Sequence, residues 1–232
     1  MKTLENQTLL YDEDCPLCSL YTTGFVKAGM LSDNVKKPFS GNSFSFIEKV
    51  ARIRPINYLL KKLYSFISYN RKVIIPNKRT SKPITCIPDF NYKYRILYIT
   101  FTVVITTLAL FSYSRLISTL SNTNLIRELL LTIGQLIFQN LFLIRSNKKI
   151  RLNYIGNLMT VSLMGSLFLI PILFINKLAP LPEIIILVWF GLTVALMFAE
   201  HFRRVRILGL PTYLCYTWVL YRIIALALLL NL

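Results

Sequence analysis

The sequence predicts a mainly α-helical integral membrane protein, with about five transmembrane helices after a small N-terminal cap. Two observations lead to this prediction. Several apolar runs after Arg95 are long enough to cross a bilayer, which takes about 20 residues each. The connections between these runs alternate between basic and weakly charged, as expected for a chain that keeps its basic loops on the cytoplasmic side. The mean hydropathy of +0.53 agrees with this assignment.

The N-terminal cap, residues 1–54, contains two cysteines at a predicted junction between a strand and a helix. Residues 7–11 form a short apolar run typical of a strand, and apolar residues at helical spacing follow the second cysteine. In this Cys15-x-x-Cys18 motif the first sulfur would lie at the helix N-terminus, where the helix dipole favours a thiolate. The second sulfur would lie one turn on, close enough to resolve a mixed disulfide. The motif predicts a dithiol redox site, with zinc ligation or a vestigial motif as alternatives.

The run Tyr-Asp-x-x-Cys-Pro-x-Cys, which contains Asp12, Cys15 and Cys18, resembles the DCC family of thiol-disulfide oxidoreductases, named for its Asp-Cys-Cys signature. Segments 46–75 and 86–90 look similar to membrane-anchored members of that family. The resemblance implies a thioredoxin-like fold without a cofactor, in which Cys15 attacks, Cys18 resolves and Asp12 has a supporting role. Asp12 could equally end the strand and cap the following turn. A complete domain of this kind takes roughly 100 residues, so the fold implied here is a truncated one.

The net charge of +17 is concentrated ahead of the first apolar run. Residues 36–95 contain fourteen basic and two acidic side chains. Such an excess is typical of nucleic-acid binding or of a juxtamembrane segment that faces anionic lipid. Because a hydrophobic span follows at once, we expect the anionic inner leaflet of the membrane as the partner and no nucleic acid.

The juxtamembrane segment, residues 55–94, is predicted to begin with a basic amphipathic helix. Pro55 is a favourable first helical residue, and one face is apolar: Ile56, Leu59, Leu60, Leu63 and Ile67. This helix either lies in the membrane interface or packs on a soluble core. Residues 71–94, which contain three prolines, are predicted to be extended and irregular.

The membrane domain, residues 95–232, is predicted to contain five spans: 95–114, 125–144, 152–175, 183–200 and 212–231. The segment before the first span is basic, and the connection around 118–124 has no charge. The later connections are basic, weakly charged and basic again: Arg145, Lys148, Lys149 and Arg151; Lys177; Arg203, Arg204 and Arg206. This alternation predicts a cytoplasmic N-terminus and an outside C-terminus. The membrane is expected to be the bacterial inner (cytoplasmic) membrane.

Four polar residues within or at the ends of the spans are candidates for a membrane site. Gln135 and Gln139 would either bond between helices or line a polar cavity. His201 would be a proton-relay or quinone-site residue, or a snorkelling residue at a helix end. Arg222 would bind an anionic group or a partner helix, or would pair or snorkel outward.

All four cysteines are expected on the cytoplasmic side, which is reducing, so we expect no structural disulfide. Cys86 would exchange disulfides with Cys15 or be inert, and Cys215 is near the inner end of the fifth span. The expected function is therefore a membrane-anchored thiol-disulfide oxidoreductase that acts on a protein thiol. The alternatives are a non-enzymatic membrane subunit or scaffold with a partner subunit, and a quinone-linked redox protein.

Overall fold

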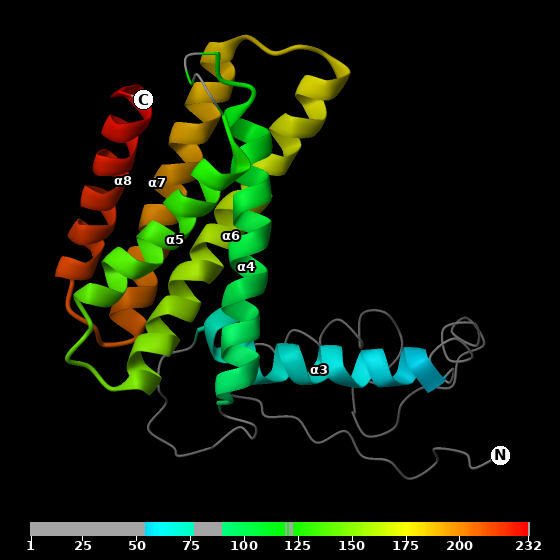
Figure 1. Cartoon of the computed structure of the whole chain (residues 1–232), viewed down its shortest axis with the longest axis vertical. Helices are drawn as coiled ribbons and strands as arrows, with labels where there is room; N and C mark the ends of the chain where they lie inside the picture. Colours follow the sequence, from blue (N-terminus) through cyan, green and yellow to red (C-terminus); the bar gives the residue numbers. More distant parts are fainter. Residues whose placement is uncertain (1–53, 77–89, 119, 121–122, 232) are drawn as a thin grey trace, which may run out of the picture. The chain divides into compact units, whose positions relative to one another are not determined.

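The computed structural model describes residues 54–76, 90–118, 120 and 123–231, and these residues form six α-helices and no strand (Figure 1). The chain divides into two compact units, residues 1–91 and 92–232. The predictions for the cap, with Asp12, Cys15 and Cys18, and for Cys86 lie outside the described residues. The helices of both units are α3 (Arg54–Ile74), α4 (Tyr92–Ser114), α5 (Leu125–Leu141), α6 (Lys148–Leu178), α7 (Glu183–Ile207) and α8 (Tyr213–Asn231).

In the first unit, α3 is the helix that the sequence predicts to begin at Pro55. It continues through Arg71 to Ile74, so the prediction of an extended segment from Arg71 is wrong for these four residues. The same prediction is wrong for residues 92–94, because α4 begins at Tyr92. The basic side chains of Arg71 and Lys72 in the last turn complement the helix dipole. Pro76 lies just beyond the end, because proline cannot continue a helix.

The second unit is a bundle of five helices in which consecutive helices are antiparallel and the neighbours α4 and α6 are parallel. Helix α4 packs against α5 and α6, and α8 packs against α5 and α7. Helix α7 also packs against α6, so the five helices form a closed ring in the order α4, α5, α8, α7, α6 (Figure 1). An additional contact between α5 and α6 crosses the ring.

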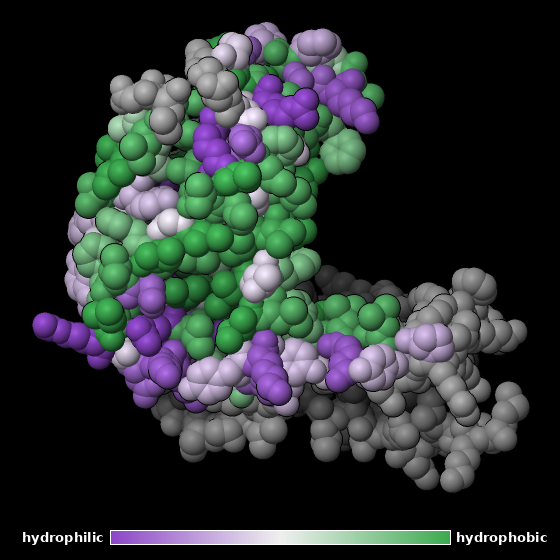
Figure 2. Space-filling view, in the orientation of Figure 1, coloured by the Kyte–Doolittle hydropathy of each residue, from purple (hydrophilic) through white to green (hydrophobic). Residues whose placement is uncertain are grey.

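Three helices, α4, α6 and α7, are long and apolar enough to cross a membrane. Helix α8 is apolar over the shorter stretch Tyr213–Leu229, and α5 has 17 residues with Arg127 and Glu128 near its start. The bundle face in Figure 2 is hydrophobic over most of its length, as expected for helices that face lipid. The protein is thus mainly α-helical with a membrane-spanning character, and each of the five predicted apolar segments is a helix.

The ends of the bundle differ in charge. We call the end with the α5–α6 and α7–α8 connections the basic end, and the opposite end the far end. The basic end contains nine basic residues: Lys93, Arg95, Arg145, Lys148, Lys149, Arg151, Arg203, Arg204 and Arg206. The far end contains Arg115, Arg127 and Lys177 together with Glu128 and Glu183. Since the first connection begins at Arg115, it is not free of charge, but the asymmetry that the sequence predicts is present.

Helix boundaries differ from the prediction where polar side chains cap them. Helix α6 begins at Lys148 instead of 152, because the Asn147 side chain accepts a hydrogen bond from the Lys149 N–H at 3.1 Å. Asn124 caps α5 in the same way through the Ile126 N–H, also at 3.1 Å. The basic residues at the start of α6 are therefore helical, although they lie in a predicted loop.

Candidate functional site: a cavity inside the helix ring

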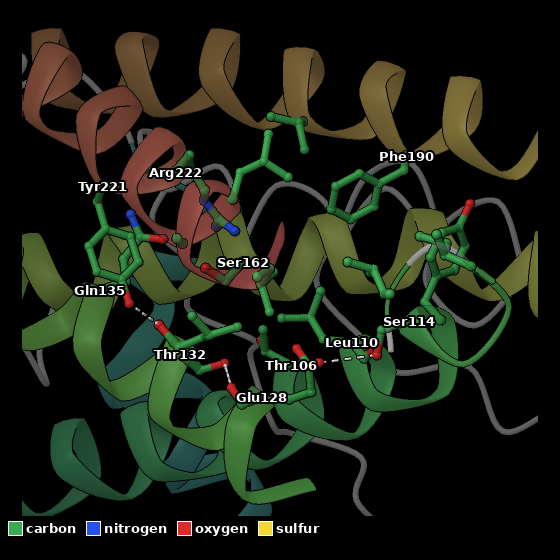
Figure 3. Close-up of a pocket in the computed structure, with 18 of the residues that line it drawn as sticks. Thr106, Leu110, Ser114, Glu128, Thr132, Gln135, Ser162, Phe190, Tyr221 and Arg222 are labelled. Atoms are coloured by element: carbon green, nitrogen blue, oxygen red, sulfur yellow. Dashed lines mark hydrogen bonds between the residues drawn. The ribbon is translucent and has the colours of Figure 1, made fainter. Parts of the chain in front are cut away.

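All five helices of the bundle contribute to one cavity of about 330 Å³ (Figure 3). Its lining residues come from the far-end halves of α4, α5, α7 and α8 and from the middle of α6. The cavity exists because the five helices form a closed ring, so that residues far apart in the sequence line the same space. Most of the lining is apolar, and a few polar side chains project into it.

The carboxylate of Glu128 is on the α5 wall, and its Oε1 already has partners. Glu128 is 4% exposed, and its Oε1 accepts hydrogen bonds from Ser114 Oγ at 3.1 Å and from Arg127 Nη2 at 2.7 Å. The backbone oxygen of Glu128 accepts a hydrogen bond from Thr132 Oγ1 at 2.9 Å (Figure 3). The ion pair with Arg127 neutralises this buried carboxylate, so Glu128 does not offer a free negative charge to the cavity.

On the neighbouring wall, α8 places Arg222 and Tyr221 at the cavity (Figure 3). The Arg222 guanidinium lies over the Trp218 ring, 4.9 Å from its centroid, a cation–π contact that orients the side chain. Tyr221 donates its hydroxyl to the Leu131 carbonyl of α5 at 2.6 Å. No hydrogen bond or ion pair joins Arg222 to Glu128, so Arg222 does not pair with this carboxylate.

Three buried polar atoms at the cavity have no hydrogen-bond partner among the described residues. They are Gln135 Nε2, Thr106 Oγ1 and Arg222 Nε. Gln135 is 5% exposed and Thr106 is 6% exposed, so water does not satisfy them from outside the bundle. Because a buried polar group without a partner is costly, these atoms indicate that the cavity accommodates hydrogen-bond acceptors.

A second polar cluster near the basic end contains Gln139 and His201. Gln139 Oε1 accepts hydrogen bonds from Tyr154 at 2.7 Å and from Thr217 at 3.3 Å. The His201 ring lies between the Tyr154 and Trp218 rings, with centroids at 5.9 and 5.8 Å. Gln139 is 0% and His201 2% exposed. Both residues therefore hold helices together, and His201 does not snorkel to the helix end.

Arg204, which was expected in the connection after the fourth span, is a buried residue of α7 that contacts another helix. Its Nε lies 2.7 Å from Glu200 Oε1, and its Nη1 donates to Asn157 Oδ1 of α6 at 2.9 Å. Arg204 is 2% exposed, whereas Arg203, which also binds Glu200, is exposed. The i,i+4 spacing of Glu200 and Arg204 is the sequence signal that could have indicated this pair.

The predicted polar residues thus fall into two places. Gln135 and Arg222 both line the cavity, and Gln139 and His201 both contact Tyr154 in the second cluster. Cys215 is buried and free in the apolar core beside this cluster. Within the described part of the chain, no group of three or more histidine, cysteine or acidic residues could hold a metal ion.

No protein-family model, curated protein or solved structure that was compared with the chain matches it.

Proposed function

We propose that the chain is a membrane-anchored thiol-disulfide oxidoreductase of the bacterial inner membrane, with its dithiol on the cytoplasmic side. The supporting observation is the Cys15-x-x-Cys18 motif preceded by Asp12. The Cys15 thiolate would attack a substrate disulfide and release one substrate thiol. Cys18 would then attack Cys15 and release the second, so that the substrate is reduced to two thiols and the protein is oxidised to an intramolecular disulfide.

We propose five spans, α4 to α8, as the anchor. Helices α5 and α8 both present large exposed apolar side chains, including Leu130 and Ile137 on α5 and Ile223 and Leu226 on α8. An apolar surface of this kind would be unfavourable in water and favourable against lipid chains. The basic end would face the cytoplasm and the far end would face outward, because basic loops stay on the cytoplasmic side.

Helix α3 and the flanking basic residues would bind the anionic inner leaflet. Three large apolar side chains of α3, Tyr58, Leu59 and Leu63, are at least half exposed. The Lys62 ammonium lies 5.4 Å from the Tyr58 ring centroid. Aromatic and aliphatic side chains next to lysine are the combination that binds the headgroup boundary of anionic membranes.

The first test is the reduction potential of the Cys15/Cys18 pair in detergent-solubilised protein in which Cys86 and Cys215 are changed to serine. We expect a stable intramolecular disulfide with a potential between about −270 and −120 mV, the range of known dithiol oxidoreductases. The same protein carrying Cys18→Ser is the control, because it cannot close the disulfide. If no intramolecular disulfide forms under any thiol buffer, the proposed activity is excluded.

The second candidate is a non-enzymatic membrane subunit or scaffold, and the cavity with its unpartnered donors favours it. Such a protein would bind a ligand or partner subunit through the bundle and would not need the dithiol. A strain that depends on this protein separates the two candidates. Cys15→Ser abolishes growth if the protein acts through thiol chemistry and leaves growth unchanged if it acts as a scaffold.

A further inference from the structure

We propose that the cavity binds a single-chain amphiphile with an oxyanion head group, a carboxylate or a phosphate, which Arg222 and Gln135 hold. This binding site is independent of the proposed dithiol activity. The head group would accept hydrogen bonds from the guanidinium and the amide, and the chain would follow the apolar part of the wall toward the surface of the bundle.

The charge balance at the cavity requires an anion. Arg222 is the cation on the α8 wall, and an unpaired cation between membrane helices is expensive. Neither acidic residue at the far end pairs with Arg222, since Glu128 binds Arg127 and Glu183 accepts a hydrogen bond from Ser118 Oγ. An anionic ligand in the cavity would supply the counter-charge that Arg222 lacks among the described residues.

The donors at the cavity fit oxygen acceptors. Gln135 Nε2 and Arg222 Nε are N–H donors, buried and without partners among the described residues. Gln135 extends from α5 and Arg222 from α8, so the two donors approach the cavity from neighbouring helices of the ring (Figure 3). A guanidinium and an amide together suit a carboxylate or phosphate, whose oxygens each accept a charge-assisted or neutral hydrogen bond.

The remainder of the wall fits an alkyl chain. Leu110, Leu131, Phe190 and Leu229 contribute apolar surface from α4, α5, α7 and α8. Two further lining residues, Leu187 of α7 and Leu226 of α8, are 40% and 55% exposed, so the cavity reaches the outer surface of the bundle between these helices. Its volume of about 330 Å³ is at the small end of ligand pockets, which suits one head group with part of one chain.

The test is equilibrium binding of radiolabelled palmitate to the purified full chain in a neutral detergent. Competition with hexadecyl phosphate, hexadecanol and inorganic phosphate identifies the chemistry that is recognised. We expect hexadecyl phosphate to displace palmitate, and hexadecanol and inorganic phosphate to be at least about tenfold weaker, since the first lacks the charge and the second lacks the chain. The stronger of the two anionic amphiphiles identifies the head group.

Arg222→Met should weaken palmitate binding about tenfold or more, because it removes the charge and the donors and keeps an unbranched apolar stem. Lys177→Met, which removes an exposed cation from the same end of the bundle without touching the cavity, should leave binding unchanged. Equal affinity of hexadecanol and palmitate, or no effect of Arg222→Met, would overturn the proposal, as would tight binding of inorganic phosphate alone.

A second pair of variants avoids the risk that Arg222→Met fails to fold. Leu226→Trp places a large ring at the cavity opening on an exposed position and should reduce palmitate binding at least threefold. Ile223→Trp adds the same ring on the same helix at a position that is 59% exposed and does not line the cavity, and it should have no effect. If both variants bind like the unmodified chain, palmitate does not occupy this cavity and the proposal is wrong.

Discussion

Replacing Gly134 by alanine should destabilise the bundle through one contact between α5 and α8. A Cβ atom at position 134 would lie 2.5 Å from the Tyr221 hydroxyl oxygen, whereas ordinary contacts begin at 3.4 Å. The hydroxyl would have to move by 0.9 Å, the difference between these distances. Its hydrogen bond to the Leu131 carbonyl, 2.6 Å long, would then be broken.

The expected change in the free energy of unfolding combines two destabilising effects and one stabilising effect. Loss of the hydrogen bond costs about 0.6–1 kcal/mol in a membrane protein. Overpacking adds about 1–3 kcal/mol, and the higher helix propensity of alanine returns up to about 1 kcal/mol. We therefore expect the free energy of unfolding to fall by about 1–3 kcal/mol, measured by denaturant titration in mixed micelles.

A double-mutant cycle with Tyr221→Phe tests this reasoning. Without the hydroxyl, the nearest ring atom to the new methyl group is 3.5 Å away, an ordinary contact. Gly134→Ala should therefore be neutral or stabilising in the Tyr221→Phe background. Gly191→Ala is the control, because a Cβ there meets nothing within 4 Å. Equal effects of Gly134→Ala in both backgrounds would refute the proposed clash.

Two further predictions concern the basic end and the topology. Arg204→Met should lower the free energy of unfolding by about 2 kcal/mol or more, because it removes a buried cation that binds Glu200 and buried Asn157. Arg206→Met, an exposed control, should change it by less than about 0.5 kcal/mol. Equal effects of the two variants would contradict the burial assigned to Arg204. In intact cells of a variant without native cysteines, Lys177→Cys should react with a membrane-impermeant maleimide and Lys149→Cys should not, and the reverse pattern would invert the proposed orientation.

The helices themselves could be predicted because their signals are local. A long apolar run such as 152–175 favours a helix whatever its neighbours are, since a backbone in lipid must satisfy its hydrogen bonds internally. The charge asymmetry is equally local, because it depends only on which connections contain lysine and arginine. The structure agrees with these assignments and moves helix ends only by a few residues, at caps such as Asn147.

The candidate site could be predicted only in part. An intramembrane residue such as Arg222 or Gln135 is conspicuous in the sequence, because polar groups are costly in an apolar environment. The partner of such a residue cannot be read from the sequence, because it depends on how each helix is rotated and on which helices are neighbours. Arg204 and Asn157 illustrate this, because 47 positions separate them and a hydrogen bond of 2.9 Å joins them.

The sequence by itself determined which segments of the membrane domain are helical and which ends of those helices are basic, because hydropathy and charge act residue by residue. Only the tertiary structure decided that five helices close into a ring around a cavity and that Arg222 has no carboxylate partner within the described part of the chain. Ring order and helix rotation result from packing between distant segments, such as the close approach of Tyr221 to Gly134. No local property of either segment specifies that contact.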